Sequence, residues 1–264
     1  MAAGFRGVIF DLDGTVYLGD ALIPGAAETI RLLQDRGVRM AYLSNKPIET
    51  REAYAAKLTR LGIPTDPDTV VNSSFVMAGW LRAHAPGARV FVIGEPPLIQ
   101  ELAAAGCQIV DDPARVELVV AALDRTFDYR KLSIAMEAIK RGARFVATNP
   151  DRTCPMAGGE IPDCAAVIGA IEGCTGHQVE TIAGKPSPLM LAAALDRLGL
   201  PPANCLIVGD RLETDVLMGQ RAGVRTALVL TGVTRRQDLA THPDLHPDYI
   251  LASIRDLPDV FQES

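Results

Sequence analysis

Two carboxylates near the amino terminus have the spacing that most directly suggests chemistry. Asp11 and Asp13 follow a short apolar run and are separated by a single leucine. Because alternate residues of a strand face the same side, the two carboxylates should converge while the leucine points away. Carboxylates this close repel each other, which raises one pKa unless a cation lies between them. Mg²⁺ would relieve that conflict, since it takes oxygen ligands and keeps sites for water and a phosphate oxygen. The competing interpretation is that the two aspartates only begin a turn.

Further polar residues follow predicted strands or precede predicted helices, where an open parallel sheet binds its ligands. Ser44 and Asn45 follow an apolar run, and a hydroxyl with backbone N–H groups at a helix start can hold a phosphate. Lys185 lies just before a helix and can neutralise phosphate charge. Asp210 ends another apolar run, and Asp215 follows in the first turn of the next helix. Taken singly, these residues also fit a helix cap, a solvated loop lysine and a turn.

Short apolar runs alternate with amphipathic stretches along the whole chain, which is typical of parallel βα units. At the two ends of the chain we predict strands at 7–10, 39–43, 205–208 and 226–230, and helices at 25–36, 48–61, 188–198 and 213–222. In the middle we predict strands at 88–94, 116–123 and 143–148, and helices at 98–105 and 129–141. The fold class is therefore α/β, with a core from 1–78 and 182–264 and a second α/β domain inserted at 79–181.

Composition excludes several other classes of protein. Of the 264 residues 48% are hydrophobic and 22% are charged, as in ordinary globular proteins. The net charge of -6 and the lack of a dense basic run argue against nucleic acid as a partner. The longest apolar stretch, 189–195, is far too short to cross a membrane. The amino terminus reads as a strand and the five cysteines form no CxxC pair, so we expect a cytoplasmic protein with reduced thiols.

The order of four motifs along the chain resembles the haloacid dehalogenase (HAD) superfamily. The motifs are DLDGT, LSN, GKPSP and GDRLETD, and the superfamily's phosphatases carry DxDGT, a Ser/Thr, a Lys and GDxxxxD in the same order. LSNKP, VGDRLETDV, the long insertion and ATNPDRT within it are similar to the NagD-like or 4-nitrophenylphosphatase subfamily. This resemblance implies a Rossmann-like parallel-sheet core with an inserted α/β cap, and hydrolysis of small phosphate monoesters such as sugar phosphates or nucleotides.

The resemblance also implies a role for each motif residue. Asp11 would be the nucleophile that forms an aspartyl-phosphate, and Asp13 the general acid and then the general base. The Mg²⁺ ligands would be Asp11, the backbone carbonyl of Asp13, and Asp210, while Asp215 would orient the lysine or a metal-bound water. The residues expected to bind the phosphate group are Ser44, Asn45 and Lys185. Phosphoryl transfer mostly needs positioning and neutralised charge, which this set can supply.

The sequence leaves open two alternatives to phosphatase activity, and it leaves open which residues select the substrate. The same site could pass the phosphoryl group to a sugar hydroxyl, as a phosphomutase or phosphotransferase does, or the protein could be a non-catalytic sensor of a phosphorylated metabolite. The core motifs cannot recognise the rest of an ester, so selectivity should come from the cap. Asn149, Asp151 and Arg152 follow a predicted cap strand and are our candidates, although they also fit a solvated turn. We expect a small phosphorylated metabolite as ligand and, from the family, a homodimer.

Overall fold

The computed structural model describes residues 4–156 and 159–261, which form two compact units. The core unit contains the residues up to Ser44, Arg51–Val71, and those from Met190 onward. The inserted unit contains Asn45–Thr50 and Asn72–Leu189. The sequence predicts a cap that is bounded by residues 79 and 181, and these bounds stay a prediction.

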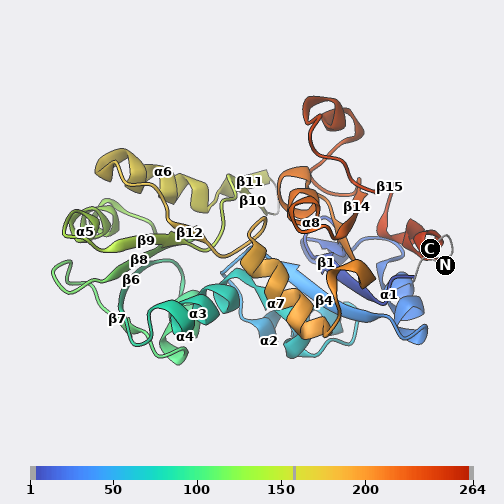
Figure 1. Ribbon diagram of the computed structural model, residues 1–264, viewed down its shortest axis with the longest axis horizontal. Helices are drawn as coiled ribbons and strands as arrows, with labels where there is room; N and C mark the ends of the chain where they lie inside the picture. Colours follow the sequence, from blue (N-terminus) through green and yellow to red (C-terminus); the bar gives the residue numbers. More distant parts are fainter. Residues whose placement is uncertain (1–3, 157–158, 262–264) are drawn as a thin grey trace. The chain divides into compact units, whose positions relative to one another are not determined.

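The core unit is built on a sheet with the strand order β15-β14-β13-β1-β4-β5, in which the strands from β15 to β4 run parallel. Figure 1 shows β1, β4, β14 and β15 of this sheet. Its strands are β1 Gly7–Asp11, β4 Arg39–Ser44, β5 Val70–Asn72, β13 Cys205–Gly209, β14 Arg225–Val229 and β15 Tyr249–Leu251. Its helices are α1 Ala26–Asp35, α2 Arg51–Arg60, α7 Pro188–Leu198, α8 Leu217–Ala222 and α9 Leu257–Val260, and a small hairpin joins β2 Tyr17–Leu18 to β3 Ala21–Leu22. The central strands are buried from end to end, as expected for a parallel sheet covered by helices.

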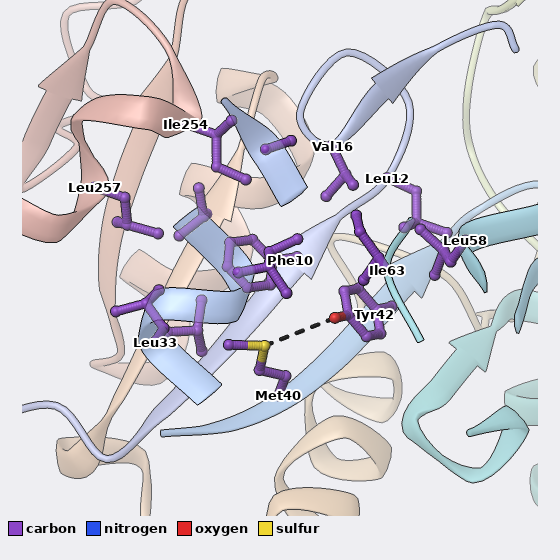
Figure 2. Packing of buried hydrophobic residues seen from close by; sticks show 14 of the residues in the cluster. Phe10, Leu12, Val16, Leu33, Met40, Tyr42, Leu58, Ile63, Ile254 and Leu257 are labelled. Atoms are coloured by element: carbon purple, nitrogen blue, oxygen red, sulfur yellow. Dashed lines mark hydrogen bonds between the residues drawn. The ribbon is translucent and has the colours of Figure 1, made fainter. Parts of the chain in front are cut away.

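The hydrophobic core of this unit fixes the strands that carry the acidic motifs. Phe10 of β1 stacks against Tyr42 of β4 with ring centroids 6.0 Å apart, and Leu12 and Leu58 belong to the same cluster (Figure 2). β1 pairs with β4 in a parallel register that sets Asp11 opposite Leu43. Aromatic side chains of this size contribute much of the burial energy of a core. The packing therefore fixes where the carboxyl end of β1 lies in the sheet.

The inserted unit has its own parallel sheet, with the strand order β12-β9-β8-β6-β7. Its strands are β6 Arg89–Ile93, β7 Gln108–Ile109, β8 Leu118–Ala121, β9 Arg144–Ala147 and β12 Thr181–Ile182. Its helices are α3 Ser73–His84, α4 Pro96–Ala104, α5 Tyr129–Lys140 and α6 Cys164–Thr175. An antiparallel hairpin of β10 Thr153–Met156 and β11 Gly159–Pro162 lies between β9 and α6 in the chain.

The prediction of an α/β fold with a parallel-sheet core is confirmed, but several elements of the inserted unit were not predicted from the sequence. These are the helices α3 and α6, the short strands β7 and β12, and the hairpin of β10 and β11. Helix α6 was missed because its sequence, CAAVIGAIEGCT, is apolar on most sides and contains two glycines, so it lacks a clear helical period. In residues 4–156 and 159–261, no helix is both long and apolar enough to cross a membrane.

Candidate active site

Three buried carboxylates meet at the carboxyl edge of the core sheet. Asp11 ends β1, Asp210 directly follows β13, and Asp215 lies in a π-helical turn, Leu212–Val216. One oxygen of each lies within 4.8 Å of the others, and their exposed fractions are only 8%, 1% and 2%. Because β1 and β13 are parallel neighbours, their carboxyl ends lie at the same edge. The sheet thus brings together residues about 200 positions apart in the sequence.

A loop after β14 holds Asp210 in place. The backbone N–H of Val233 donates to Asp210 Oδ2 at 2.6 Å, and the N–H of Thr234 donates to the backbone carbonyl of Asp210 at 3.1 Å. Thr231 Oγ1 donates to the backbone carbonyl of Gly14 at 2.6 Å, which ties the same loop to the DLDGT turn. This loop was not predicted from the sequence. Its signal was a short polar TGVT segment directly after a buried strand, a pattern common to many loops.

Two glycines allow this close packing. A Cβ on Gly14 would lie 2.6 Å from Asp210 Oδ2, and a Cβ on Gly232 would lie 2.6 Å from Asp210 Cγ. Both distances are far below ordinary contact. Gly14 also has a φ of 86°, in the left-handed region that favours glycine. Asp210 therefore lies in a space that side chains at these two positions would fill.

Asp215 is oriented by its own turn. Its Oδ2 accepts hydrogen bonds from the backbone N–H of Arg211 at 3.2 Å and from Thr214 Oγ1 at 3.4 Å. The sequence predicted an ordinary helix from residue 213, whereas the chain forms the π-helical turn first and α8 only from Leu217. Such π-helical segments occur often at functional sites. Here the turn directs a carboxylate toward the other two.

The electrostatics of the cluster favour a bound cation. Burial, together with the neighbouring carboxylates of Asp11 and Asp215, raises the pKa of Asp210 to about 8. Three mutually repelling carboxylates in a buried site form a hard-oxygen donor set, which suits Mg²⁺. The residues present therefore fit the ion that the sequence predicted. Within the described residues the three-carboxylate group does not include Asp13, for which the sequence analysis proposed only a backbone carbonyl ligand.

The side chains of Asp11 and Leu12 in the DLDGT motif have different surroundings. Leu12 is almost fully buried in the core, while Asp11 belongs to the acidic cluster and Asp13 is half-buried. Thr15 Oγ1 donates to Asp11 Oδ2 at 3.3 Å, a local bond that helps to orient this carboxylate. The burial of the leucine agrees with the strand alternation expected from DLDGT.

Ser44 and Asn45 lie next to each other in sequence but have different surroundings. Ser44, in the core unit, shares a hydrogen bond of 3.0 Å with Tyr54 Oη. Asn45, in the inserted unit, accepts the backbone N–H of Lys185 at 2.7 Å and donates to the backbone carbonyl of Lys185 at 3.1 Å. Asn45 also donates to Asp151 Oδ2 at 3.0 Å. Its side chain thus holds the Lys185 backbone in place.

Lys185 is itself deeply buried, with 3% of its surface exposed. Gly184 precedes it, and a Cβ there would lie 2.6 Å from Asn45 Oδ1. Helix α7 begins three residues later, and Ser187 Oγ accepts the N–H of Leu189 at 3.3 Å, as a helix cap does. Lys185 therefore lies buried just ahead of a capped helix start, and its contact with a phosphate group stays a prediction.

The three predicted cap residues differ sharply in exposure. Asn149 is fully buried, and its Nδ2 donates to Asp151 Oδ2 at 3.2 Å and to Asp163 Oδ1 at 3.1 Å. Asp151 is half-buried and Arg152 is exposed. Asn149 therefore contacts two aspartates inside the inserted unit. Arg152 is exposed, so its side chain is accessible to a ligand.

Comparison with known proteins identifies the family of this chain. A model of the haloacid dehalogenase-like hydrolases matches residues 8–108, and a HAD-hydrolase-like model matches residues 182–257. The chain is 40% identical over 257 residues to the sugar-phosphatase AraL of Bacillus subtilis, covering 97% of this chain and 93% of that protein. Its fold matches the crystal structure of a 4-nitrophenylphosphatase from Thermotoga maritima with a TM-score of 0.91 at 33% identity, covering 97% of each chain.

A third similar protein was crystallised with a metal ion. The glycerol phosphate phosphatase of Mycobacterium tuberculosis, determined in complex with magnesium, matches with a TM-score of 0.89 at 33% identity over 97% of this chain and 77% of that one. The chain belongs to the haloacid dehalogenase-like hydrolases. It is a phosphatase, and the family resemblance inferred from its motifs is confirmed.

Proposed function

We propose that this phosphatase hydrolyses small phosphate monoesters, sugar phosphates among them, with Mg²⁺ and through an aspartyl-phosphate on Asp11. The observation that carries the proposal is the group of three buried carboxylates at the carboxyl edge of the core sheet. The named activities of the similar proteins, on sugar phosphates and on 4-nitrophenyl phosphate, support this substrate class. Neither the transferase alternative nor the sensor alternative is favoured by a particular feature of the site.

In this mechanism the two aspartates of DLDGT act in turn. A carboxylate oxygen of Asp11 attacks phosphorus, the bond from phosphorus to the ester oxygen breaks, and Asp13 gives its proton to the departing alcohol. Asp13, now ionised, accepts a proton from water as the water oxygen attacks the phosphorus of the aspartyl-phosphate. Inorganic phosphate leaves and both carboxyl groups return to their starting states. The covalent step divides one difficult hydrolysis into two easier transfers.

The metal would be held by Asp11, Asp210 and the backbone carbonyl of Asp13, with Asp215 orienting a neighbouring group. A bound Mg²⁺ supplies a fixed positive charge that lowers the cost of gathering carboxylates and phosphate oxygens in one buried place. The loop of residues 231–234 contributes by holding Asp210 through the N–H groups of Val233 and Thr234. These contacts hold Asp210 at the carboxyl end of β13.

We assign the binding of the transferred phosphoryl group to Ser44 and Lys185, with Asn45 acting through Lys185. The Asn45 side chain uses its oxygen and its nitrogen on the Lys185 backbone, so it is a positioning residue in this proposal. A lysine ammonium neutralises phosphate charge as a compact cation. The cap, residues 79–181, would select the leaving group through Asp151 and Arg152, while the buried Asn149 fixes the turn that carries them.

The test is a panel of sugar phosphates, nucleotides, pyridoxal phosphate, glycerol phosphates and 4-nitrophenyl phosphate, ranked by kcat/KM with Mg²⁺ present. Rapid quenching should trap an acid-stable, hydroxylamine-sensitive phosphoenzyme that is absent from the variant Asp11→Asn. Turnover without such an intermediate would disprove the covalent route. If no member of the panel were hydrolysed, the assignment of substrate class would be wrong.

A further inference from the structure

The inserted unit contains a pocket that the mechanism does not use. Its volume is about 480 Å³, within the range of small-molecule sites. The residues around it come from the segment after β8, from β11 and from the start of α6, all within the inserted unit. They are Leu123, Asp124, Arg125, Phe127, Ile161, Pro162, Asp163, Ala166 and Val167.

The pocket lies beyond the carboxyl end of β8. Asp124 and Arg125 follow this strand directly, and Asp163 lies across the pocket at the start of α6. In open α/β sheets ligands bind beyond the carboxyl ends of the strands. The position is thus one that this class of sheet uses for binding.

Most of the pocket wall is apolar. Leu123, Phe127, Ile161 and Val167 supply aliphatic and aromatic surface, and they surround a space large enough for one or two rings. The two charged groups that follow β8 already have partners. Arg125 makes two hydrogen bonds of 2.6 Å to the Glu95 carboxylate, and Asp124 Oδ2 accepts from Lys131 Nζ at 2.6 Å. The pocket therefore suits a largely uncharged molecule better than a free anion.

Asp163 supplies a directed polar contact. It is 3% exposed, and its Oδ1 accepts the N–H of Cys164 at 2.6 Å and Asn149 Nδ2 at 3.1 Å. Its other oxygen, Oδ2, receives no hydrogen bond from a described residue and is not among the fully buried atoms left without a partner, so it is accessible to solvent. A carboxylate oxygen in such a place normally accepts a hydrogen bond from water. A ligand that donates a hydrogen bond to Oδ2 would replace that water.

We propose that this pocket binds a small molecule that has an apolar or aromatic ring and a hydroxyl or amino group donating to Asp163 Oδ2. Such a molecule could be the alcohol part of a phosphate ester or a separate metabolite, and the two share this chemistry. The inference goes beyond the proposed function, since binding to the inserted unit does not depend on phosphoryl transfer. Burial raises the pKa of Asp163, and a donor at Oδ2 would favour the ionised form.

The test uses the full-length protein and two fluorescent probes of similar shape, 2-naphthol and 2-methoxynaphthalene. We expect 2-naphthol to bind saturably and the methoxy compound, which has no donor, to bind at least about fivefold more weakly, as expected for a lost hydrogen bond to a charged group. Asp163→Asn keeps the cap of α6 but replaces the acceptor Oδ2 with a donor, so it should abolish that preference. The matched control is Asp128→Asn, since Asp128 caps α5 and does not line the pocket.

A second pair of variants does not depend on the cap at Asp163. Ala166→Trp, at an exposed position in the pocket wall, should fill the pocket and abolish binding of 2-naphthol. Gly173→Trp, on the same helix with open space around a Cβ, should bind like wild type. Absence of saturable binding to wild type, or equal binding to these two variants, would overturn the proposal.

Kinetics then separates the two sources of ligand, and both outcomes support the pocket. Competitive inhibition of 4-nitrophenyl phosphate hydrolysis by 2-naphthol would identify the alcohol part of a substrate. Binding without competition would identify a separate metabolite. If the protein hydrolysed no phosphate ester, the proposed function would fail while the direct binding result stayed valid.

Discussion

The substitution Gly232→Ala tests whether the position of Asp210 controls the metal site. A Cβ at residue 232 would lie 2.6 Å from Asp210 Cγ and 2.7 Å from Asp210 Cβ, so either the carboxylate or the loop must move. The backbone of Gly232 is not in the left-handed region, which means that alanine adds volume without adding backbone strain. The added methyl group therefore acts on Asp210 and on its hydrogen bond from Val233.

The size of the effect of Gly232→Ala can be taken from the free energy that overpacking costs. Extra methyl groups in well-packed interiors cost about 1–3 kcal/mol. If Asp210 moves and the cost falls on metal binding, 1.36 kcal/mol per factor of ten gives roughly a 5- to 150-fold rise in the Mg²⁺ concentration for half-maximal activity. If the loop moves instead, the same energy is lost from the free energy of unfolding.

Two measurements on each variant distinguish these routes. The first is phosphatase activity titrated with Mg²⁺, and the second is the denaturant midpoint without metal. The matched control is Gly79→Ala in α3, where a Cβ would meet nothing within 4 Å. It should leave the Mg²⁺ titration unchanged and stabilise its helix by about 0.4–1 kcal/mol.

A folded Gly232→Ala protein with wild-type stability and a wild-type Mg²⁺ titration would refute the reasoning. That result would mean that the space over Gly232 does not fix Asp210, or that Asp210 is not a ligand of the metal. Movement of the titration midpoint alone would show that the loop of residues 231–234 acts mainly through the metal site.

Four further outcomes are expected. Asp11→Asn should lower kcat by at least about 10³-fold while the protein stays folded, since it removes one of three repelling carboxylates, and more than a tenth of wild-type activity would contradict its role as nucleophile. Chelation should abolish turnover and Mg²⁺ should restore it, whereas Asp210→Ala should need far more metal; full activity after metal stripping would rule out this requirement. Asp151→Ala should reorder the substrate panel while leaving 4-nitrophenyl phosphate nearly unaffected, and a uniform loss would indicate a damaged fold instead. Burial raises the pKa of Asp163, so the folded state holds this proton more tightly than the unfolded state does. The free energy of unfolding should therefore fall as pH rises from about 4 through the raised pKa. Asp163→Asn should remove this part of the pH dependence in denaturant titrations.

Most of the core site could be predicted because its residues occur at the ends of recognisable strands. Asp11 and Asp210 each follow a buried apolar run, and the rule that parallel strands end at one edge is enough to bring them together. The loop of residues 231–234 could not be predicted, since its contribution consists of backbone N–H groups and the absence of a side chain at Gly232. Contacts of that kind depend on the folded geometry and leave almost no trace in residue type.

The inserted unit was harder to predict for a different reason. Asn149 was predicted as a site residue because it is polar and follows a strand. Its side chain donates hydrogen bonds to Asp151 and to Asp163, and Asp163 follows the hairpin of β10 and β11, which was not predicted. Asp163 was not identified because it precedes a helix whose apolar sequence has no clear period. A polar residue after a strand thus located this turn, while its hydrogen-bond partner Asp163 depended on an element that the pattern did not reveal.

The hydrogen bonds of Asn45 have a consequence for the modularity of this chain. The backbone carbonyl of Asn45 accepts from Ser73 Oγ at 2.6 Å, and its side chain binds the backbone of Lys185. The start and the end of the long insertion are therefore both tied to one residue, and a loop whose ends are already close costs little entropy to close. A foreign domain with adjacent termini could be grafted between residues 73 and 185 with short linkers, so the asparagine marks a position at which inserted domains can be exchanged.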